Sequence, residues 1–236
     1  MLDFKNGLIL LVDKEPGWTS FDIVAKIRST LRRKFKDTVK HIKVGHAGTL
    51  DPFATGLLII LIGKKTKNQE GLMKLDKKYI ATLKLGATST TGDPEGIIKK
   101  TTSFIPKPIT IGDIETVLEG FLGETFQTPP AHSAIKINGK RAYMLARAGK
   151  EFKLKPRKIT IYDIKILDYK WPLLKIETSV SSGTYIRKLA EDTGKSLGCG
   201  AYLTGLRRTK IGEYDISDSK KINIVLKDVL NKNLLK

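Results

Sequence analysis

The stretch Gly45-His46-Ala47-Gly48-Thr49-Leu50-Asp51-Pro52-Phe53-Ala54-Thr55-Gly56-Leu57-Leu58 is the most informative part of this 236-residue chain. Three glycines surround a single histidine, His46, and a single aspartate, Asp51. Glycine allows backbone conformations that other residues avoid, and it lets a ligand come close to the main chain. A carboxylate in such a backbone is a candidate for chemistry, so Asp51 is the residue that needs an explanation.

Asp51 also has a purely structural interpretation. An Asp-Pro pair is a good helix start, because the Asp side chain caps free amides and Pro52 suits the first helical position. Residues 53–62 are apolar and could continue as a buried helix or strand. Taken alone, this local pattern favours capping over catalysis, and His46 in a tight loop could simply bind backbone. The choice between capping and catalysis for Asp51 therefore depends on other parts of the chain.

The charge of the chain indicates a polyanionic partner. Lys and Arg number 43 against 24 Asp and Glu, which leaves a net charge of +19. Such an excess attracts nucleic acid and speeds its association. A generally lysine-rich composition is the alternative, but the basic residues are clustered. The clusters are Arg32-Arg33-Lys34 with Lys36, Lys64-Lys65 with Lys67, residues 153–158, and Arg207-Arg208 with Lys210.

Several classes of protein are disfavoured by composition. The apolar stretches are too short for a secretory signal or a transmembrane helix, so a cytoplasmic protein without a membrane partner is expected. Cys199 is the only cysteine, which excludes an internal disulfide and a cysteine-based zinc site. The three histidines lack the spacing of a helical metal motif. Phosphate-binding glycine loops are not found either. We therefore expect neither a metal nor a cofactor.

The order of predicted elements indicates an α+β fold. Strands are predicted over 7–13, 57–62, 78–85, 159–168, 173–180 and 200–206. A helix is predicted over about 21–33 with Ser20 as its cap, and a short helix follows the strand 57–62 to about residue 73. Further helices are predicted from Thr110 to about 120, from a Thr184 cap to Gly198, and in the last 20 residues. Residues 36–56 are expected to be a long loop. Strands and helices alternate irregularly, which favours a mixed sheet over a doubly wound parallel one.

Residues 126–158 differ from their surroundings. They contain Pro129-Pro130, a turn at Gly139, a helix-like segment over 141–148 and a basic run that ends at Pro156. This composition predicts an insertion that lies outside the core of the domain.

Five motifs, in order along the chain, resemble those of the TruB family of RNA pseudouridine synthases. They are the catalytic motif Gly45–Leu58, the tyrosine strand Asp76–Tyr79, the RNA-clasping insertion with Pro129–Lys136, Gly139–Tyr143 and Ala146–Gly149, the arginine helix Ser182–Arg187, and the basic motif Leu206–Thr209 with Ile211-Gly212. Together they span about residues 7–215. Five motifs in one order are far more specific than any one of them, and they shift the interpretation of Asp51 to catalysis.

The resemblance implies a fold and a domain organisation. The fold is the α+β pseudouridine synthase fold, a mixed, largely antiparallel sheet flanked by helices and loops. Residues 1–215 form the catalytic domain, with an RNA-clasping insertion at about 126–158. Residues 216–236 form a helical tail, and the C-terminal RNA-binding domain common in bacterial members is expected to be absent or vestigial.

Three positions depart from the family pattern. His132 stands where the family usually has Tyr or Phe, which keeps a ring for stacking. Ser182 stands where Lys is frequent, so one phosphate contact is expected to be lost. Thr90 stands where the family usually has an aspartate near the active centre, and this change is expected to affect rate or the order of the active site.

The resemblance also implies the activity: isomerisation of uridine to pseudouridine in the T loop of tRNA, at position 55. Asp51 is the implied nucleophile on a flipped-out base, as carboxylates are in retaining glycosidases. Arg187 is implied as the cation that keeps it ionised. An arginine in the first turn opposes the helix dipole, so a carboxylate is expected to hold it. Tyr79 is implied to stack on the uracil and to assist proton transfer. The path (sugar attack, base addition or glycal formation) stays open.

Further residues are carried over from the matched motifs. His46 would fill the gap left by the flipped nucleotide, and Tyr185 and Leu206 would line the base pocket. Weaker RNA contacts are implied for Lys136, Arg141, Arg147, Arg207 and Arg208. The sequence of Phe53–Gly56 resembles that of the bacterial stand-alone enzymes more than that of their guide-RNA-dependent relatives. We therefore expect a monomer that acts on the T arm of free tRNA without a guide RNA.

Two other functions fit the same scaffold and charge. One is a non-catalytic factor that binds or folds tRNA, which leaves the joint presence of Asp51, Tyr79 and Arg187 unexplained. The other is a synthase that acts on a different RNA. Product formation on tRNA, and its loss in an Asp51 variant, separates them from the function implied by the resemblance.

Overall fold

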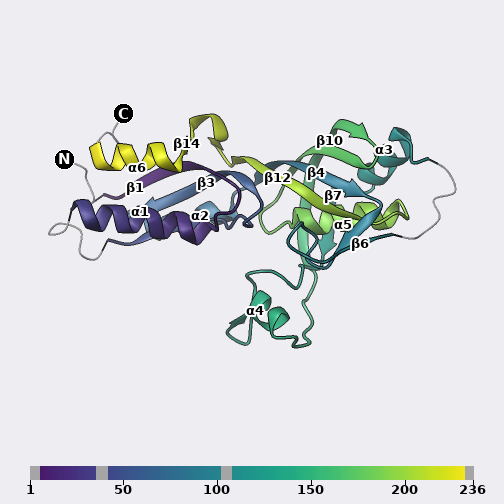
Figure 1. Cartoon of the computed structure of the whole chain (residues 1–236), viewed down its shortest axis with the longest axis horizontal. Helices are drawn as coiled ribbons and strands as arrows, with labels where there is room; N and C mark the ends of the chain where they lie inside the picture. Colours follow the sequence, from purple (N-terminus) through teal and green to yellow (C-terminus); the bar gives the residue numbers. More distant parts are fainter. Residues whose placement is uncertain (1–5, 36–41, 102–107, 232–236) are drawn as a thin grey trace. The chain divides into compact units, whose positions relative to one another are not determined.

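The computed structural model describes residues 6–35, 42–101 and 108–231 (Figure 1). The chain divides into two compact units, the first made of Met1–Tyr79 and Leu206–Lys236 and the second of Ile80–Gly205. It passes between them inside two strands, β4 (Lys77–Leu85) and β12 (Ala201–Ile211). Most strand pairs are antiparallel, whereas β1–β14 and β3–β12 are parallel. The predicted α+β class with a mixed, largely antiparallel sheet is confirmed.

The first unit is built around β3 (Thr55–Ile62), which pairs with both β1 (Leu8–Lys14) and β2 (Val44–Ala47). Its residues 57–62 are fully buried. An uninterrupted apolar run is what a strand covered on both faces requires. Two helices of this unit, α1 (Ser20–Lys34) and α6 (Ile222–Asn231), pack against each other (Figure 1).

Local details of the first unit differ from the predictions. Thr19, not Ser20, caps α1, because Thr19 and Asp22 exchange the two hydrogen bonds of a capping box. The predicted loop 36–56 contains β2, and its residues 36–41 lie outside the described part of the chain. The helix predicted to about residue 73 is a 3₁₀ helix, η1 (Gly63–Asn68), followed by α2 (Gln69–Lys74).

The second unit carries the strand order β4-β11-β10-β7. Here β11 is Leu173–Val180, β10 is Arg157–Lys170 and β7 is Gly123–Gln127. Helix α3 (Ile111–Glu119) is capped by Thr110, as predicted, whereas Tyr185 rather than Thr184 is the cap residue of α5 (Ile186–Ser196). Thr184 instead closes the preceding turn, since its N–H donates to the carbonyl of Ser181.

The insertion is part of the second unit and connects two paired strands, β7 and β10. Gln127 of β7 lies opposite Arg157 of β10, so the segment outside the sheet is 128–156, slightly shorter than predicted. It holds the small hairpin β8–β9 (Lys136–Ile137 and Lys140–Arg141) and the helix α4 (Ala142–Arg147) (Figure 1).

The remaining elements are short. They are the hairpin β5–β6 (Ala87–Ser89 and Ile98–Lys100), the strands β13 (Tyr214–Asp215) and β14 (Lys220–Lys221), and the 3₁₀ helix η2 (Ile216–Asp218). The last predicted strand, 200–206, is longer than expected and continues to Ile211. The C-terminal helix is present as α6, and residues 232–236 lie outside the described ranges. Within those ranges, no helix combines the length and the apolar composition needed to cross a membrane.

Candidate active site

Asp51 lies in a turn that leads into β3, not at the start of a helix. The N–H of Ala54 donates to the carbonyl of Asp51 at 3.1 Å, and β3 begins at the next residue, Thr55. The helix-cap interpretation is therefore wrong, because the apolar residues that follow Pro52 continue as a buried strand. The Asp51 side chain is half-buried on this turn.

A buried arginine holds the backbone on both sides of Asp51. The guanidinium of Arg208 donates to the carbonyls of Gly48 (3.0 Å), Thr49 (3.5 Å) and Leu57 (2.8 Å). Arg208 is only 1% exposed. The planar fork of arginine can bind several carbonyls at once. The phosphate contact expected of Arg208 is thus replaced by a structural role, since its donors face the protein interior.

Two further buried side chains bind the residues next to Asp51. The ammonium of Lys14, at the end of β1, donates to the carbonyls of Glu15, Trp18 and Pro52 at 3.0, 2.7 and 3.1 Å. The hydroxyl of Ser20 pairs with both the N–H (2.8 Å) and the carbonyl (3.2 Å) of Leu50. Each polar group is buried with its hydrogen-bond partners, as such groups must be. The turn is therefore fixed one residue before and one residue after Asp51.

The glycine at position 56 is required by this arrangement. Gly56 has a φ of +103° and lies opposite Arg208 in the parallel pair β3–β12. A Cβ atom at Gly56 would be 2.3 Å from the carbonyl oxygen of Arg208. Only glycine fits both the backbone conformation and the close approach.

Replacing Arg208 by Lys is expected to destabilise the protein by about 2 kcal/mol, because a lysine ammonium cannot reach three separate carbonyls and leaves buried acceptors unsatisfied. Urea unfolding followed by fluorescence measures this loss. Arg207→Lys is the matched control: Arg207 binds Asp13 at 3.0 and 2.9 Å but is 40% exposed, so its substitution should cost less than about 1 kcal/mol. Equal losses for the two variants would contradict the role given to Arg208.

The first unit also contains three more of the predicted site residues. His46 lies in β2, Tyr79 in β4 with 8% exposure, and Leu206 in β12 with partial burial. Burial, and then the charge of Arg208, lowers the pKa of His46, so its imidazole is neutral near pH 7. Its Nδ1 atom is buried and has no hydrogen-bond partner among the described residues.

Lys77 adds a pH-sensitive charge to the first unit. Its ammonium donates to the carbonyls of Met73 and Leu75, where α2 ends. Burial and the charge of Arg208 lower its pKa from 10.5 to about 8, against the opposing effect of Asp76. Between pH 8 and pH 10.5 the folded protein has lost this proton while the unfolded chain still holds it, so the Lys77 contribution to stability rises with pH in this window.

This titration gives a measurable prediction. From pH 7 to pH 10, the free energy of unfolding of the wild type should rise by roughly 2–3 kcal/mol relative to Lys77→Met, which has no proton to lose. Urea unfolding of both proteins at the two pH values tests it. A difference that stays constant with pH would show that Lys77 titrates normally.

The second unit positions Arg187 in the first turn of α5. Arg187 is 6% exposed, and its guanidinium pairs with the Asp93 carboxylate at 3.1 Å. It also donates to the carbonyls of Thr91 (3.0 Å) and His132 (2.9 Å). Asp93, in the turn between β5 and β6, is a carboxylate that holds this arginine. Asp93 is the functional candidate that was missed.

Asp93 is itself held by its turn. Its carboxylate accepts hydrogen bonds from the hydroxyl of Thr91 and the N–H of Glu95, and its carbonyl accepts one from Ser89. Thr90, the position that departs from the family pattern, is exposed, and its hydroxyl accepts the N–H of Ile97 at 3.0 Å. Thr90 therefore closes the turn, while the carboxylate next to Arg187 comes from Asp93.

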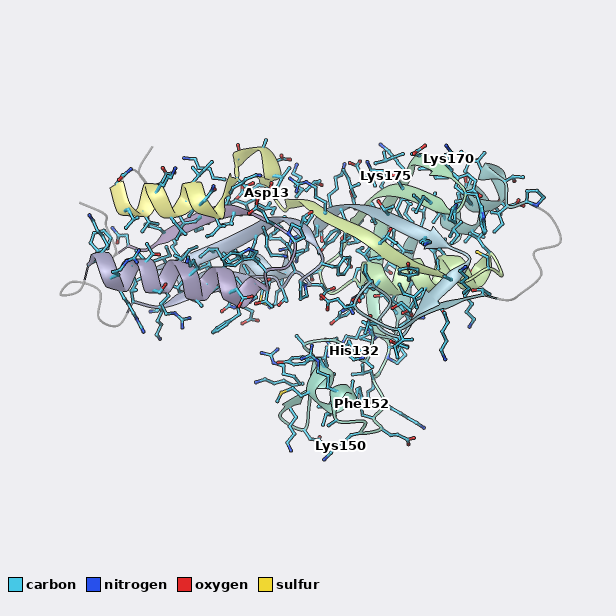
Figure 2. All side chains as sticks on the ribbon, in the orientation of Figure 1. Asp13, His132, Lys150, Phe152, Lys170 and Lys175 are labelled. Atoms are coloured by element: carbon cyan, nitrogen blue, oxygen red, sulfur yellow. The ribbon has the colours of Figure 1, made fainter. Side chains whose placement is uncertain are left out.

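The predicted RNA contacts of the insertion lie at its surface. Lys136, Arg141 and Arg147 are exposed. Arg141 donates to the carbonyl of Ala134 at 2.7 Å, and the Arg147 guanidinium lies 5.7 Å from the centre of the Tyr143 ring. Figure 2 shows many side chains projecting from the insertion. Contact of these residues with RNA stays a prediction.

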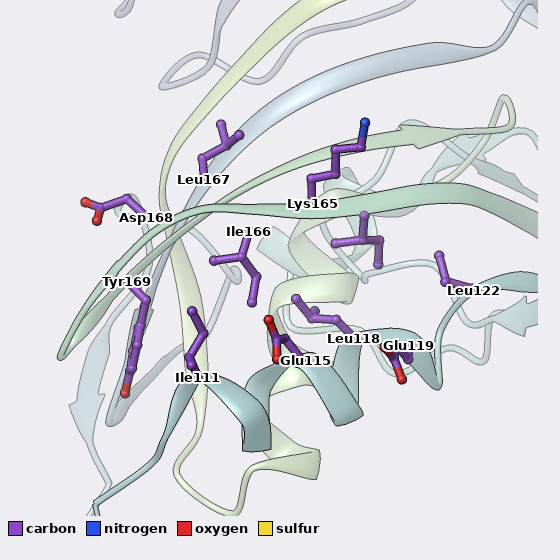
Figure 3. Close-up of a pocket in the computed structure, with 11 residues that line it drawn as sticks. Ile111, Glu115, Leu118, Glu119, Leu122, Lys165, Ile166, Leu167, Asp168 and Tyr169 are labelled. Carbon is purple, nitrogen blue, oxygen red and sulfur yellow. The ribbon is translucent and has the colours of Figure 1, made fainter.

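A groove of about 720 Å³ lies elsewhere in the second unit, between α3 and β10 (Figure 3). Ile166 and Tyr169 of β10 point toward α3, where Ile111 and Leu118 line the groove. None of the predicted catalytic or RNA-contacting residues lines it. We therefore take the turn around Asp51 in the first unit and the surroundings of Arg187 in the second unit, each by itself, as candidate sites in preference to this groove.

Comparison with known proteins identifies the family. The model of the TruB family pseudouridylate synthase N-terminal domain matches residues 32–186, and that of the tRNA pseudouridylate synthase B C-terminal domain matches residues 187–234. The chain belongs to the TruB family of pseudouridylate synthases. The resemblance found in the sequence motifs is thus confirmed.

Individual relatives agree with this assignment. The chain is 47% identical to tRNA pseudouridine synthase B of Parabacteroides distasonis, over 100% of this chain and 98% of the relative. It is 48% identical to tRNA pseudouridine synthase B of Phocaeicola vulgatus, over 92% and 91% of the two chains. Among solved structures, a Cbf5-Nop10-Gar1 complex matches with a TM-score of 0.71 and 25% identity, over 99% of this chain and 58% of that one.

Proposed function

We propose that this protein isomerises uridine to pseudouridine in the T loop of tRNA, at position 55, with Asp51 as the nucleophile. The observation that carries the proposal is the turn that presents Asp51, which buried Arg208, Lys14 and Ser20 hold by its backbone. Such preorganisation suits a catalytic group rather than a packing residue. The names of the relatives, tRNA pseudouridine synthase B, support tRNA as the substrate.

The reaction breaks the N-glycosidic bond of uridine and joins the same uracil to the ribose through carbon. The base has to leave the RNA stack first, and His46 would fill the gap with its neutral imidazole. Asp51 has to be ionised whether it attacks the sugar, adds to the base or assists a glycal path. Tyr79 would stack on the uracil, and Tyr185 and Leu206 would line its pocket. Arg187, whose guanidinium is held by Asp93, would keep Asp51 ionised.

Recognition of the RNA would be mainly electrostatic and by shape. The net charge is +19, and the exposed cations Lys136, Arg141 and Arg147 on the insertion could bind phosphates. Arg207 would contribute its charge near the surface, although it is paired with Asp13. We propose a cytoplasmic monomer that acts on the T arm of free tRNA without a guide RNA.

An unmodified tRNA transcript tests this function directly. Incubation with the purified protein, followed by chemical labelling of pseudouridine and primer extension, should give one new stop at the T-loop uridine. A bare T-arm hairpin should also be modified, because no guide is needed. Tight binding without product would favour the non-catalytic tRNA-binding factor, and product only on other RNA would favour a different substrate.

A further inference from the structure

Gln127 lies at the end of β7, where the insertion begins, and is 6% exposed. Its carboxamide makes two hydrogen bonds to one residue of another segment. The N–H of Tyr185 donates to Gln127 Oε1 at 2.8 Å, and Gln127 Nε2 donates to the carbonyl of Tyr185 at 3.1 Å. A primary amide is the side chain that offers one acceptor and one donor in this geometry.

Tyr185 is the residue at which α5 begins, and the helix has no side-chain cap of the usual kind there. The Tyr185 carbonyl accepts the N–H groups of Lys188 and Leu189, which starts the helix. Gln127 therefore holds the backbone of the residue at which the first turn of α5 starts. Arg187 is in that first turn, so its position follows from that of Tyr185.

The insertion is bonded to the same turn a second time. The carbonyl of His132 accepts a hydrogen bond from the Arg187 guanidinium at 2.9 Å. The next residue, Ser133, accepts the N–H of Tyr143 in α4 at 3.0 Å. A short series of bonds thus runs from the helix of the insertion to Arg187, and Gln127 holds the start of the insertion to Tyr185.

We propose that Gln127 is a positioning residue which couples engagement of RNA by the insertion to the placement of Tyr185 and Arg187. The proposal rests on the function proposed above only for its effect on rate. Hydrogen bonds from the root of the insertion reach the backbone of Tyr185 and the side chain of Arg187. A shift of the insertion on binding RNA is therefore transmitted to both.

Hydrogen exchange tests the coupling without using activity. In the wild type, we expect a tRNA transcript to slow amide exchange in the insertion, residues 132–147, and also at residues 185–189. In Gln127→Met, exchange at 185–189 should be faster in the free protein, and tRNA should protect only the insertion. Unchanged exchange at 185–189 in this variant would overturn the proposal. If the wild type shows the coupling but forms no pseudouridine, only the proposed function fails.

The rate of the reaction gives a second readout. Gln127→Met should lower the single-turnover rate roughly 10- to 100-fold while the Kd for tRNA changes less than about twofold, as expected for a displaced catalytic group. Phe126→Thr, at the neighbouring and 72% exposed position, is the matched control and should leave both values unchanged. A purely structural role of Gln127 would instead weaken binding and rate together.

Gln127→Glu provides the conservative test. A protonated carboxyl has one O–H donor and one acceptor, so it can replace the amide, whereas the ionised form cannot donate to the Tyr185 carbonyl. Burial next to a carbonyl raises the pKa of such a carboxyl. The rate of Gln127→Glu relative to the wild type should therefore rise as the pH is lowered from 8 to 6. A ratio that does not change with pH would contradict the two-bond role.

Discussion

Asp51→Asn is expected to abolish pseudouridine formation, with a loss of single-turnover rate of at least about 10⁴-fold. Asn is nearly the same size as Asp but has no negative charge and is a far weaker nucleophile. The backbone of the turn is held by the buried side chains of Arg208, Lys14 and Ser20, which the substitution leaves in place, so the fold should persist. Primer-extension mapping of a tRNA transcript measures the product.

The binding of tRNA distinguishes this result from a loss of folding. The free energy of tRNA binding by Asp51→Asn should differ from that of the wild type by no more than about 1 kcal/mol, since one half-buried side chain is changed. Glu70→Ala, at an exposed position of α2 with no predicted role in the site, serves as an active control. Product formation by Asp51→Asn at a rate near that of the wild type would remove Asp51 from the mechanism.

Asp93→Ala should have the largest effect on stability, about 3–5 kcal/mol, because it removes a buried carboxylate from a buried arginine. The side chains of Arg187 and Asp93 are 7% and 4% exposed. Two hydrogen bonds from Thr91 and Glu95 to the same carboxylate are lost as well. Urea unfolding measures the loss of stability. At temperatures where the variant remains folded, its single-turnover rate should also fall.

Two variants bracket this effect. Asp93→Asn keeps an acceptor for Thr91 and Glu95 but loses the charge, so it should cost less than Asp93→Ala while still lowering the rate. Glu124→Ala breaks the exposed pair with Lys158 and should change stability by less than about 1 kcal/mol. If Asp93→Ala were as mild as Glu124→Ala, the buried ion pair would not hold Arg187.

Much of the fold was predictable because it follows from local patterns. The apolar run 57–62 predicted the central strand β3, and Thr110 predicted the start of α3. The Asp51 motif was recognisable because its glycines and carboxylate are adjacent in the chain. Elements that depend on tertiary contacts were harder to predict from the sequence. The segment of β2 was predicted to be loop. Thr184 was predicted to cap α5, but the cap residue is Tyr185, whose N–H donates to Gln127.

The residues that support the site could not be found in the same way. Arg208 was predicted to contact RNA and Lys14 was not singled out, because a sequence does not show that the carbonyls they bind come from segments far along the chain. Asp93 was not predicted, because its partner Arg187 lies 94 residues away in the chain. A lysine at the end of an apolar strand, as Lys14 is in β1, was the one available signal of a buried cation.

The pairing of Gln127 with Arg157 has an evolutionary consequence. It holds the two ends of the insertion next to each other in the β7–β10 ladder, so the segment between them behaves as a closed loop on a fixed base. The entropy of closing such a loop depends only weakly on its length. The length and composition of the distal part of the insertion can therefore change at little cost in stability, while the residues at its root stay constrained by their bonds to Tyr185 and Arg187.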